Sequence, residues 1–311
     1  MSASKRAVEA PLEATPLVSF ALFIRNEIST VEKCLDSLLG QTIADLELVI
    51  SDNASDDGTL EILQRYERRD RRVRLFAQEK NIGLVNNVNF VINACRGRFV
   101  RLIGGHDWLE QDYAEVCLGA AQQVPKAVVV TTEFDISDEH GNIRSGQYKG
   151  ARLESDNALV RLRKLLFFFH AGDAEYDPVY SLIRRDALLE TGLIRMMASA
   201  DWVLSVELSL SGPFAHVDRC LAHRIKFVGQ YSQPEEVLKS YHPEKFQSLR
   251  TSAARLLFEF SRVLWSGDLS LIKKLLGQLS IVRFYCREVA LRSWPVVRRS
   301  VGAVLRRFGL R

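Results

Sequence analysis

The chain has 311 residues, of which 47% are hydrophobic and 26% are charged. This balance is typical of a globular protein with a sizeable core, and it excludes a disordered or fibrous class. The formal net charge is +4, but residues 281–311 hold eight arginines and one acidic residue, so they carry +7 and the remaining residues sum to −3. Nucleic-acid-binding proteins usually carry their positive charge on the main domain, so we expect no nucleic-acid partner.

The first 15 residues are polar and lack the apolar segment of a signal peptide, so we expect a flexible leader. The five cysteines lie far apart in the sequence and their number is odd. These features argue against a disulfide framework or a zinc cluster and indicate a reducing, cytoplasmic compartment. No apolar run approaches the roughly 18 residues that a membrane span needs.

Residues 16–135 alternate between two patterns. Mostly apolar runs predict strands at Leu17–Ile24, Leu46–Ile50, Val73–Ala77, Arg98–Ile103 and Ala127–Thr132. Helical spacing of apolar residues predicts helices at Ile28–Leu39, Thr59–Arg69, Val85–Cys95 and Asp112–Gln123. Short strands that alternate with helices predict an α/β fold with a mostly parallel sheet that is covered on both faces.

The second half of the chain has a different rhythm. A turn is expected at residues 138–142, and helices are expected at Asn157–Phe169, Arg185–Glu190 and Ala200–Ser211. Short strands are expected at Pro178–Ile183, Phe214–Val217 and Leu221–Phe227. From Pro234 onward the pattern predicts only helices, with breaks at residues 266–268 and near Pro295. We therefore predict an α/β domain over residues 16–230 and a helical extension over residues 231–311.

Polar side chains follow two of the predicted strands. Asp52 extends the second strand, and Gly104-Gly105-His106-Asp107 follows the fourth. In an open α/β sheet, ligands bind outside the carboxyl ends of the strands. The Asp52 carboxylate can accept hydrogen bonds from a base or a ribose, whereas Asp56 and Asp57 are better explained as caps of the next helix. The chain lacks glycine-rich phosphate loops, so a metal on the 104–107 loop is the expected counter-charge for phosphates.

The segment from Val18 to Tyr113 resembles the nucleotide-sugar half of family 2 inverting glycosyltransferases of the GT-A fold, of the bacterial polysaccharide and cell-envelope type. The resemblance rests on segments in the family's order: Phe23–Glu27, Cys34–Thr42, Ser51–Thr59, Asn81–Gly83 and Gly97–Val100. It implies a Rossmann-like GT-A domain with a donor half at residues 16–113 and an acceptor half at residues 114–230. The donor nucleotide would contact Asn26, Glu27, Asp52, Asn53, Asn81 and Gly83.

The resemblance also implies the chemistry. Asp201 takes the place of the family's general base, which accepts a proton from the hydroxyl of a saccharide or lipid-linked acceptor. Asp107, with His106 as a second ligand, would hold Mn²⁺ or Mg²⁺ beside the diphosphate of a nucleoside-diphosphate sugar. Alternatively, His106 contacts ribose or donates to a phosphate oxygen, and Asp201 is a helix-start acid favoured by the helix dipole.

Two positions depart from the family pattern. The metal loop keeps one acid, Asp107, where two or three are usual, and Ala200 replaces the first acid of the pair that Asp201 completes. A non-catalytic relative that binds a nucleotide sugar or a glycan, with a decayed metal site, is therefore the alternative function.

The C-terminal segment has its own pattern. Within Val296–Phe308, apolar residues form one helical stripe, and four arginines lie off it. This pattern predicts a basic amphipathic helix either on an anionic membrane surface, at the inner face of the membrane, or docked on the body with its arginines outward.

Overall fold

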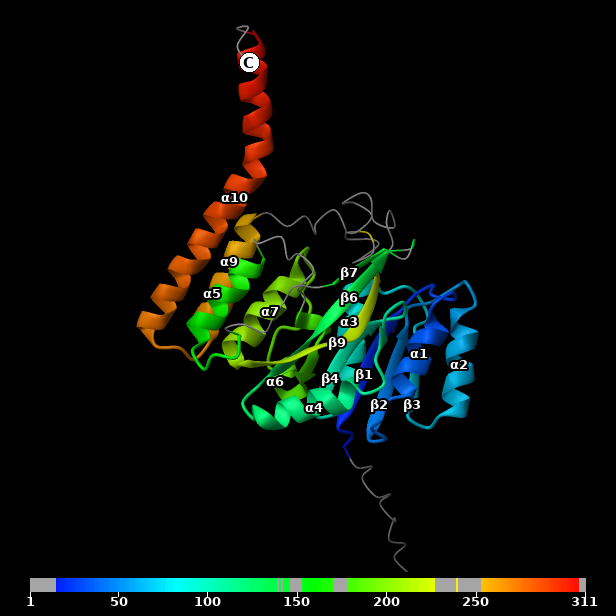
Figure 1. Ribbon diagram of the computed structural model, residues 1–311. Helices are drawn as coiled ribbons and strands as arrows, with labels where there is room; N and C mark the ends of the chain where they lie inside the picture. The colour runs from blue at the N-terminus through cyan, green and yellow to red at the C-terminus, as the bar shows by residue number, and fades with distance from the viewer. Residues whose placement is uncertain are drawn as a thin grey trace, which may run out of the picture.

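The computed structural model describes residues 15–138, 140, 142–145, 153–169, 178–226, 239 and 253–307, and the backbone alone beyond Ala290 (Figure 1). Residues 1–14 of the predicted leader therefore lie outside the described residues, as does the proposed domain boundary near residue 230. The side chains of the predicted C-terminal stripe lie outside them too.

The N-terminal half is a parallel sheet, as predicted. Its strands are β1 (Val18–Ile24), β2 (Leu46–Asp52), β3 (Val73–Ala77) and β4 (Phe99–Gly104), in the order β3-β2-β1-β4. The connecting helices are α1 (Val31–Leu39), α2 (Thr59–Arg69) and α3 (Leu84–Ala94). The strands β1, β2 and β4 are buried along nearly their whole length, as their apolar sequences predicted. Helices cover both faces of the sheet at these strands.

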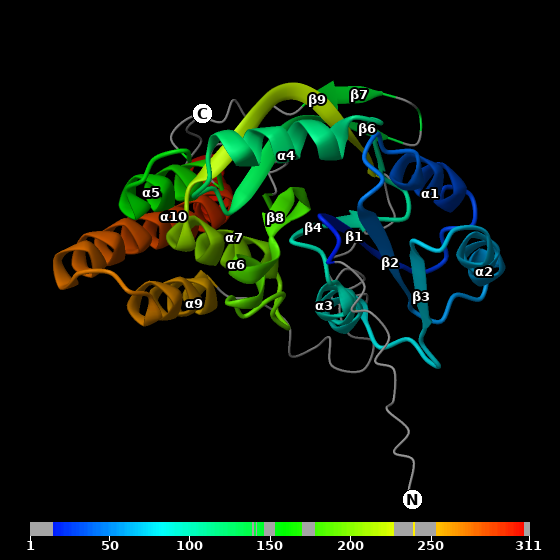
Figure 2. The same cartoon turned by 90° about the horizontal axis from the view of Figure 1, so that it is seen from below.

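The second half extends this sheet and makes it mixed. It contains β5 (Trp108–Leu109), α4 (Tyr113–Gln123), β6 (Val129–Asp138), β7 (Ile143–Ser145), α5 (Ala158–Phe168), the short 3₁₀ helix η1 (Pro178–Tyr180), β8 (Leu182–Arg184), α6 (Arg185–Leu189), α7 (Ala200–Ser211) and β9 (Phe214–Lys226). The strand order continues as β8-β6-β9-β5, with β8 and β5 antiparallel to their neighbours, and β6 parallel to β9. Figure 2 shows the sheet curling around α4, with β9 above this helix in the view and β8 and β4 below it.

Three local expectations were wrong. The two strands predicted at residues 214–227 are one strand, β9, because register shifts opposite Glu133 absorb the polar Asp218-Arg219 pair. The strand predicted from Pro178 begins instead as a 3₁₀ turn, which the fixed φ of proline permits. The break expected near Pro295 does not occur, and the helix continues to Arg307.

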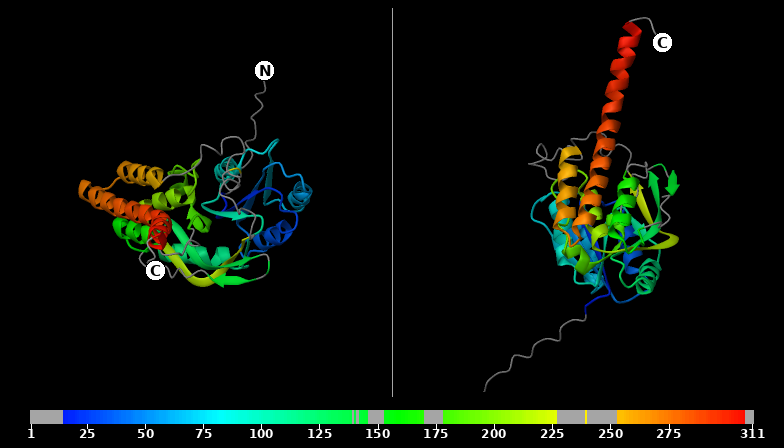
Figure 3. Two further views of the ribbon diagram at one scale, coloured as in Figure 1. Left: turned by 90° about the horizontal axis from the view of Figure 1, so that it is seen from above. Right: turned by 90° about the vertical axis from the view of Figure 1, so that its left-hand side faces the viewer.

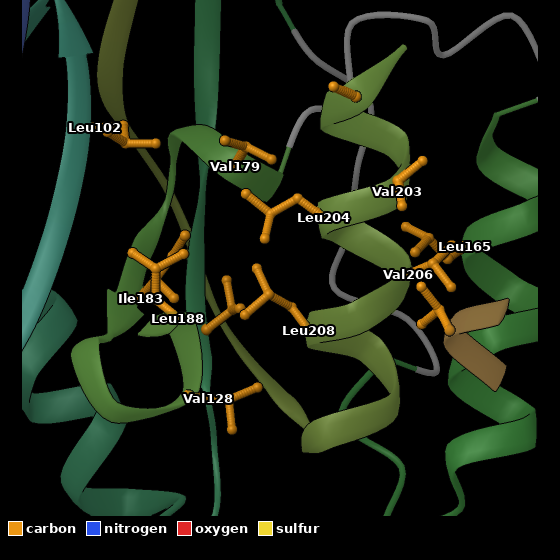
Figure 4. Close-up of a cluster of buried hydrophobic side chains, with 14 of the residues drawn as sticks. Leu102, Val128, Leu165, Val179, Ile183, Leu188, Val203, Leu204, Val206 and Leu208 are labelled. Carbon is orange, nitrogen blue, oxygen red and sulfur yellow. The ribbon is translucent and has the colours of Figure 1, made fainter. Parts of the chain in front are cut away.

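Two cores lie on opposite faces of the sheet. One contains buried side chains of α1, α2 and α4, and the other contains those of α3, α5 and α7. Figure 4 shows the second core around α7, where Leu204 points toward Val179 and Val206 points toward Leu165 of α5. Packing of α7 on both of these sides fixes the position of its first turn, which contains Asp201.

The C-terminal helices, α9 (Ala253–Ser266) and α10 (Leu271–Arg307), pack against α5 and α7. A cluster of aromatic rings joins these elements: Phe169, Trp202, Phe260 and Phe284. Figure 3 shows α10 continuing well beyond the body of the protein. Among the described residues, no helix combines the length and the apolar character that a membrane crossing requires.

Candidate active site

The main cleft opens at the carboxyl ends of β1, β2 and β4, where the sequence placed the ligand site. The last residue of β1, Ile24, pairs with Asp52, and Phe23 pairs with Gly104, so the three loops that follow these strands lie side by side. A cavity of about 460 Å³ lies among them. Its lining includes five of the predicted residues: Asn26, Glu27, Asn53, Asn81 and His106.

Asn53, Asn81 and Gly83 form one hydrogen-bonded group at the edge of this cavity. The Asn53 amide donates to Asn81 Oδ1 at 2.9 Å, and Asn81 Oδ1 also accepts the Gly83 N–H at 2.8 Å. Asn53 Oδ1 accepts the N–H of Ile82 at 2.8 Å. Gly83, the residue before α3, has a φ of 83°. A residue with a side chain would adopt this backbone conformation only with strain. These bonds fix the loop after β2 against the start of α3.

Asp52 is adjacent to this group, but it is fully buried. Its carboxylate accepts hydrogen bonds from the backbone N–H and the hydroxyl of Ser55. In this conformation Asp52 therefore stabilises the loop after β2. Asn26 has a similar supporting role, since its side chain exchanges hydrogen bonds with Asp56 at 2.8 and 3.0 Å. The residues predicted to contact the nucleotide are therefore brought together, with Asn53 and Asn81 on the wall and Asp52 behind it.

The loop after β4 holds His106 between two carboxylates. His106 Nδ1 lies 2.9 Å from Glu27 Oε1, and its Nε2 lies 3.8 Å from Asp107 Oδ1. Burial alone would lower the pKa of His106, but the bond with Glu27 and the charge of Asp107 outweigh it and raise this pKa above its usual value. His106 is thus fixed in orientation, with Nε2 on the side of Asp107.

Asp107 is almost completely buried, at 2% exposure. Its Oδ1 accepts the N–H of Ile225 at 3.3 Å, and its Oδ2 lies 3.9 Å from Nε of Arg224. The donor set of one imidazole nitrogen and one carboxylate oxygen fits Mn²⁺ better than Mg²⁺. A carboxylate on the other nitrogen of a histidine is the usual support of a metal-bound imidazole, and Glu27 supplies it.

Asp201 lies on the other side of Tyr180. It is half-buried in the first turn of α7 and lines a second cavity, of about 190 Å³, together with Tyr180 and Arg224. The two cavities share Phe23, Leu84 and Tyr180, so they form one divided cleft. Ala200, the residue before Asp201, is almost completely buried and borders the smaller cavity.

Sequence reasoning missed two residues of this cleft. The Arg224 guanidinium carbon lies 4.1 Å from the centre of the Tyr180 ring. Tyr180 borders both cavities, and Arg224 borders the smaller one. Its alternation with His223 along β9 was the available signal, but only the pairing of β9 with β6 shows which face it occupies.

The curled mixed sheet with helices on both faces is the fold of GT-A glycosyltransferases. The solved structure of residues 1–349 of S. aureus TarS in complex with UDP-GlcNAc has a TM-score of 0.64 at 14% identity, covering 89% of this chain and 75% of that one. The mannosyltransferase PcManGT from Pyrobaculum calidifontis, in complex with GDP-Man and Mn²⁺, has a TM-score of 0.51 at 14% identity, covering 93% and 80%. At this identity the likeness concerns the fold.

Comparison of the sequence with known families identifies the family of this chain. The model of glycosyl transferase family 2 matches residues 19–192, and the chain belongs to this family. Chondroitin synthase of Escherichia coli is 31% identical over 221 residues, which are 70% of this chain and 30% of that protein. Hyaluronan synthase of Pasteurella multocida is 29% identical over 136 residues, 43% of this chain and 14% of that protein. The chain thus spans less than a third of either relative.

Proposed function

We propose that the protein is an inverting glycosyltransferase that moves a sugar from a nucleoside-diphosphate donor to an acceptor hydroxyl. The observation that carries this proposal is the divided cleft, in which Asn53, Asn81 and His106 line one cavity and Asp201 lines the other. The donor nucleotide occupies the larger cavity, and the acceptor enters beside Asp201. Membership of family 2 supports the same reaction.

The donor half binds the nucleoside through the loop after β2. Asn53 faces the base and ribose, and the buried Asp52 lies directly behind it. Asn81 and Gly83 hold the loop from the side of α3, while Asn26 and Glu27 form the opposite wall. For Asp52 to take part, its carboxylate exchanges one bond from Ser55 for a base N–H or a ribose hydroxyl, which keeps the buried acceptor satisfied.

The diphosphate lies against the loop after β4. His106 and Asp107 would hold a divalent cation there, and such a cation stabilises the negative charge that develops on the departing diphosphate. Arg224 is 3.9 Å from Asp107 and contributes a fixed positive charge to the same region.

Asp201 acts as the general base. Its carboxylate accepts the proton of the acceptor hydroxyl while that oxygen forms a bond to the anomeric carbon of the donor sugar. The bond from the anomeric carbon to the diphosphate oxygen breaks in the same step, and its electron pair leaves with the diphosphate. Attack from the face opposite the leaving group inverts the anomeric centre.

The experiment is a transfer and donor-hydrolysis assay with a panel of nucleotide sugars, with Mn²⁺ and with a chelator, together with calorimetry of UDP and GDP. Binding of one diphosphate and turnover of its sugar support the proposal. A protein that binds no nucleoside diphosphate refutes it. Binding with no turnover of any donor, and no effect of Asp201→Asn, indicates the non-catalytic relative instead.

We infer that the acceptor is a saccharide of a surface polysaccharide or glycolipid, since the relatives include chondroitin and hyaluronan synthases.

We also infer from the exposed face of α10 that the protein acts at the cytoplasmic face of an anionic membrane. Large apolar side chains at i, i+4, i+8 and i+11 lie on this face: Leu271, Leu275, Leu279 and Val282, with Ile272 and Leu276 beside them. Residues 271–311 contain ten basic residues and one acid. An apolar stripe with a basic surround is typical of helices that bind anionic lipid surfaces.

Flotation with vesicles tests the membrane proposal on the full chain. Binding is expected to vesicles that contain anionic lipid, and the double variant Ile272→Asp and Leu275→Asp is expected to abolish it. Ile143→Asp is the matched control, because Ile143 on β7 is 67% exposed and Ile272 is 71% exposed. Equal binding by the double variant and the wild type rules the proposal out. A wild-type protein that does not bind vesicles with anionic lipid also rules it out.

A further inference from the structure

A second group of ligand-type side chains lies on β6 and β9. The carboxylate of Asp135, the thiol of Cys220 and a ring nitrogen of His223 approach one another within 4.8 Å. The cysteines are widely spaced in the sequence and do not predict such a group. It forms because two strands that are far apart along the chain pair side by side.

A register shift places the three residues on one face of the sheet. Glu133 pairs with Cys220, Phe134 with Ala222 and Asp135 with His223, so Leu221 is an extra residue in β9. In a regular strand, residues three apart point to opposite faces. The extra residue corrects the alternation, and Cys220 joins His223 and Asp135. Arg224, the next residue, points to the opposite face and lines the cleft.

His223 is held in one orientation. Its ring stacks on Trp108 with a centroid distance of 5.1 Å and an interplanar angle of 13°, and the Lys33 ammonium covers the same indole at 3.1 Å. Its Nε2 lies 2.9 Å from Glu110 Oε1, and its Nδ1 lies 3.9 Å from Asp135 Oδ2. In the tautomer with the proton on Nε2, this nitrogen donates a hydrogen bond to Glu110, and the lone pair of Nδ1 faces Asp135. This is the carboxylate–histidine arrangement that supports metal-bound imidazoles.

The remaining two side chains are placed for the same role. Ser145 donates to Asp135 Oδ1 at 2.7 Å, which orients the carboxylate. Burial and the carboxylates of Asp135, Glu133 and Glu110 raise the pKa of Cys220 to about 12. The same three carboxylates lie near the thiol and attract a cation to this position.

We propose that Asp135, Cys220 and His223 form a zinc site on the face of the sheet opposite the cleft, with water as the fourth ligand. A thiolate, an imidazole and a carboxylate are a zinc donor set, whereas Mg²⁺ prefers oxygen ligands alone. Metal–ligand bonds of about 2.0 to 2.3 Å place tetrahedral ligand atoms roughly 3.3 to 3.8 Å apart, so closure needs a movement of about 1 Å. Binding exchanges the thiol proton for a sulfur–zinc bond and releases that proton to solvent.

The site has a structural consequence for the cleft. Trp108 follows Asp107 and His223 precedes Arg224 in the sequence. The ligand His223 and its stacking partner Trp108 are therefore the immediate neighbours of the two charged residues of the diphosphate region. A metal at this point ties β9 to β6 at the irregular part of their pairing. The stacking of Trp108 extends that support to β5.

Cobalt binding to the chelator-treated full chain is the test, because a cobalt–thiolate bond gives a charge-transfer band in the near ultraviolet. We expect one Co²⁺ per chain with this band, displacement by Zn²⁺, and a higher melting temperature with Zn²⁺. Cys220→Ser and His223→Gln are expected to lose the band. Cys286→Ser is the matched control, since Cys286 is an exposed thiol on α10. Glu110→Gln is expected to weaken zinc binding about 10- to 100-fold.

Several results overturn the proposal. These are the absence of a thiolate band in the wild type, a band that survives Cys220→Ser, and a band that Cys286→Ser removes. Melting curves without metal establish that each variant folds, and His223→Gln keeps the test decisive if Cys220→Ser does not. UDP calorimetry on the same samples reports the cleft independently, so failure of the zinc site and failure of the proposed transferase are distinguishable.

Discussion

Replacement of Asp201 by asparagine separates catalysis from binding. Asparagine has the same shape but cannot accept a proton from the acceptor hydroxyl at neutral pH. General-base catalysis contributes about 10²- to 10⁴-fold, which corresponds to about 3 to 5 kcal/mol of barrier. Asp201 lines the smaller cavity, whereas Asn53, Asn81 and His106 line the larger one. We therefore expect kcat to fall by about three orders of magnitude, and the Kd for the donor diphosphate to change by less than about twofold.

The control addresses the other interpretation of Asp201, that it only stabilises the start of α7. Glu115 is an acid in the first turn of α4, so Glu115→Gln removes the same kind of charge from a helix start outside the cleft. A helix-dipole role predicts a loss of about 0.3 to 1 kcal/mol in unfolding free energy for either variant, with activity retained. Urea unfolding, initial rates of transfer and calorimetry measure the three quantities. Transfer by Asp201→Asn at more than a tenth of the wild-type rate refutes the general-base assignment.

Three further outcomes are expected. Glu47→Gln lowers the unfolding free energy by about 2 kcal/mol at pH 7, because burial alone would raise the pKa of Glu47, but hydrogen bonds led by that of Ser19 hold it below its usual value. This contribution is full above the ordinary carboxyl pKa and disappears as the pH falls through the lowered folded value, so urea unfolding of wild type and variant converges in acid. His106→Gln weakens UDP binding in Mn²⁺ but not in chelator, and equal losses in both would show a direct phosphate contact. Gly105→Ala weakens UDP binding in calorimetry, because the new Cβ would lie 2.6 Å from Ile24 Cδ1.

The N-terminal half was predictable because its signals are local. The helix at Thr59–Arg69 and the strand at Val73–Ala77 match the prediction residue by residue. The helix has polar and apolar faces, and the strand is a short apolar run between polar turns, so periodicity alone defines them. The positions of Asn53, Asn81 and His106 follow, since each lies at or after the end of an element in the parallel sheet.

The acceptor side could not be predicted in the same way, because it depends on long-range pairing. Tyr180 is placed by a 3₁₀ turn, and Arg224 by the register of β9 against β6. Neither the turn nor the register has a periodic signature. The burial of Asp52 behind Asn53 also required the structure, because a strand-end carboxylate can point to the ligand or to its own loop with equal local propensity.

The loop Gly104-Gly105-His106-Asp107 is better understood as a built unit than as a damaged acidic motif. A Cβ on Gly104 would lie 3.2 Å from Cε1 of His106, and a Cβ on Gly105 would lie 3.2 Å from the Cβ of Glu27. Gly104 therefore gives the imidazole its space, and Gly105 leaves room for Ile24 and for Glu27, whose carboxylate lies 2.9 Å from Nδ1 of His106. An acid in place of His106 would face Glu27 and Asp107 as a third carboxylate. The histidine instead joins the two carboxylates into one connected group, so the loss of acids and the gain of glycines are parts of the same arrangement.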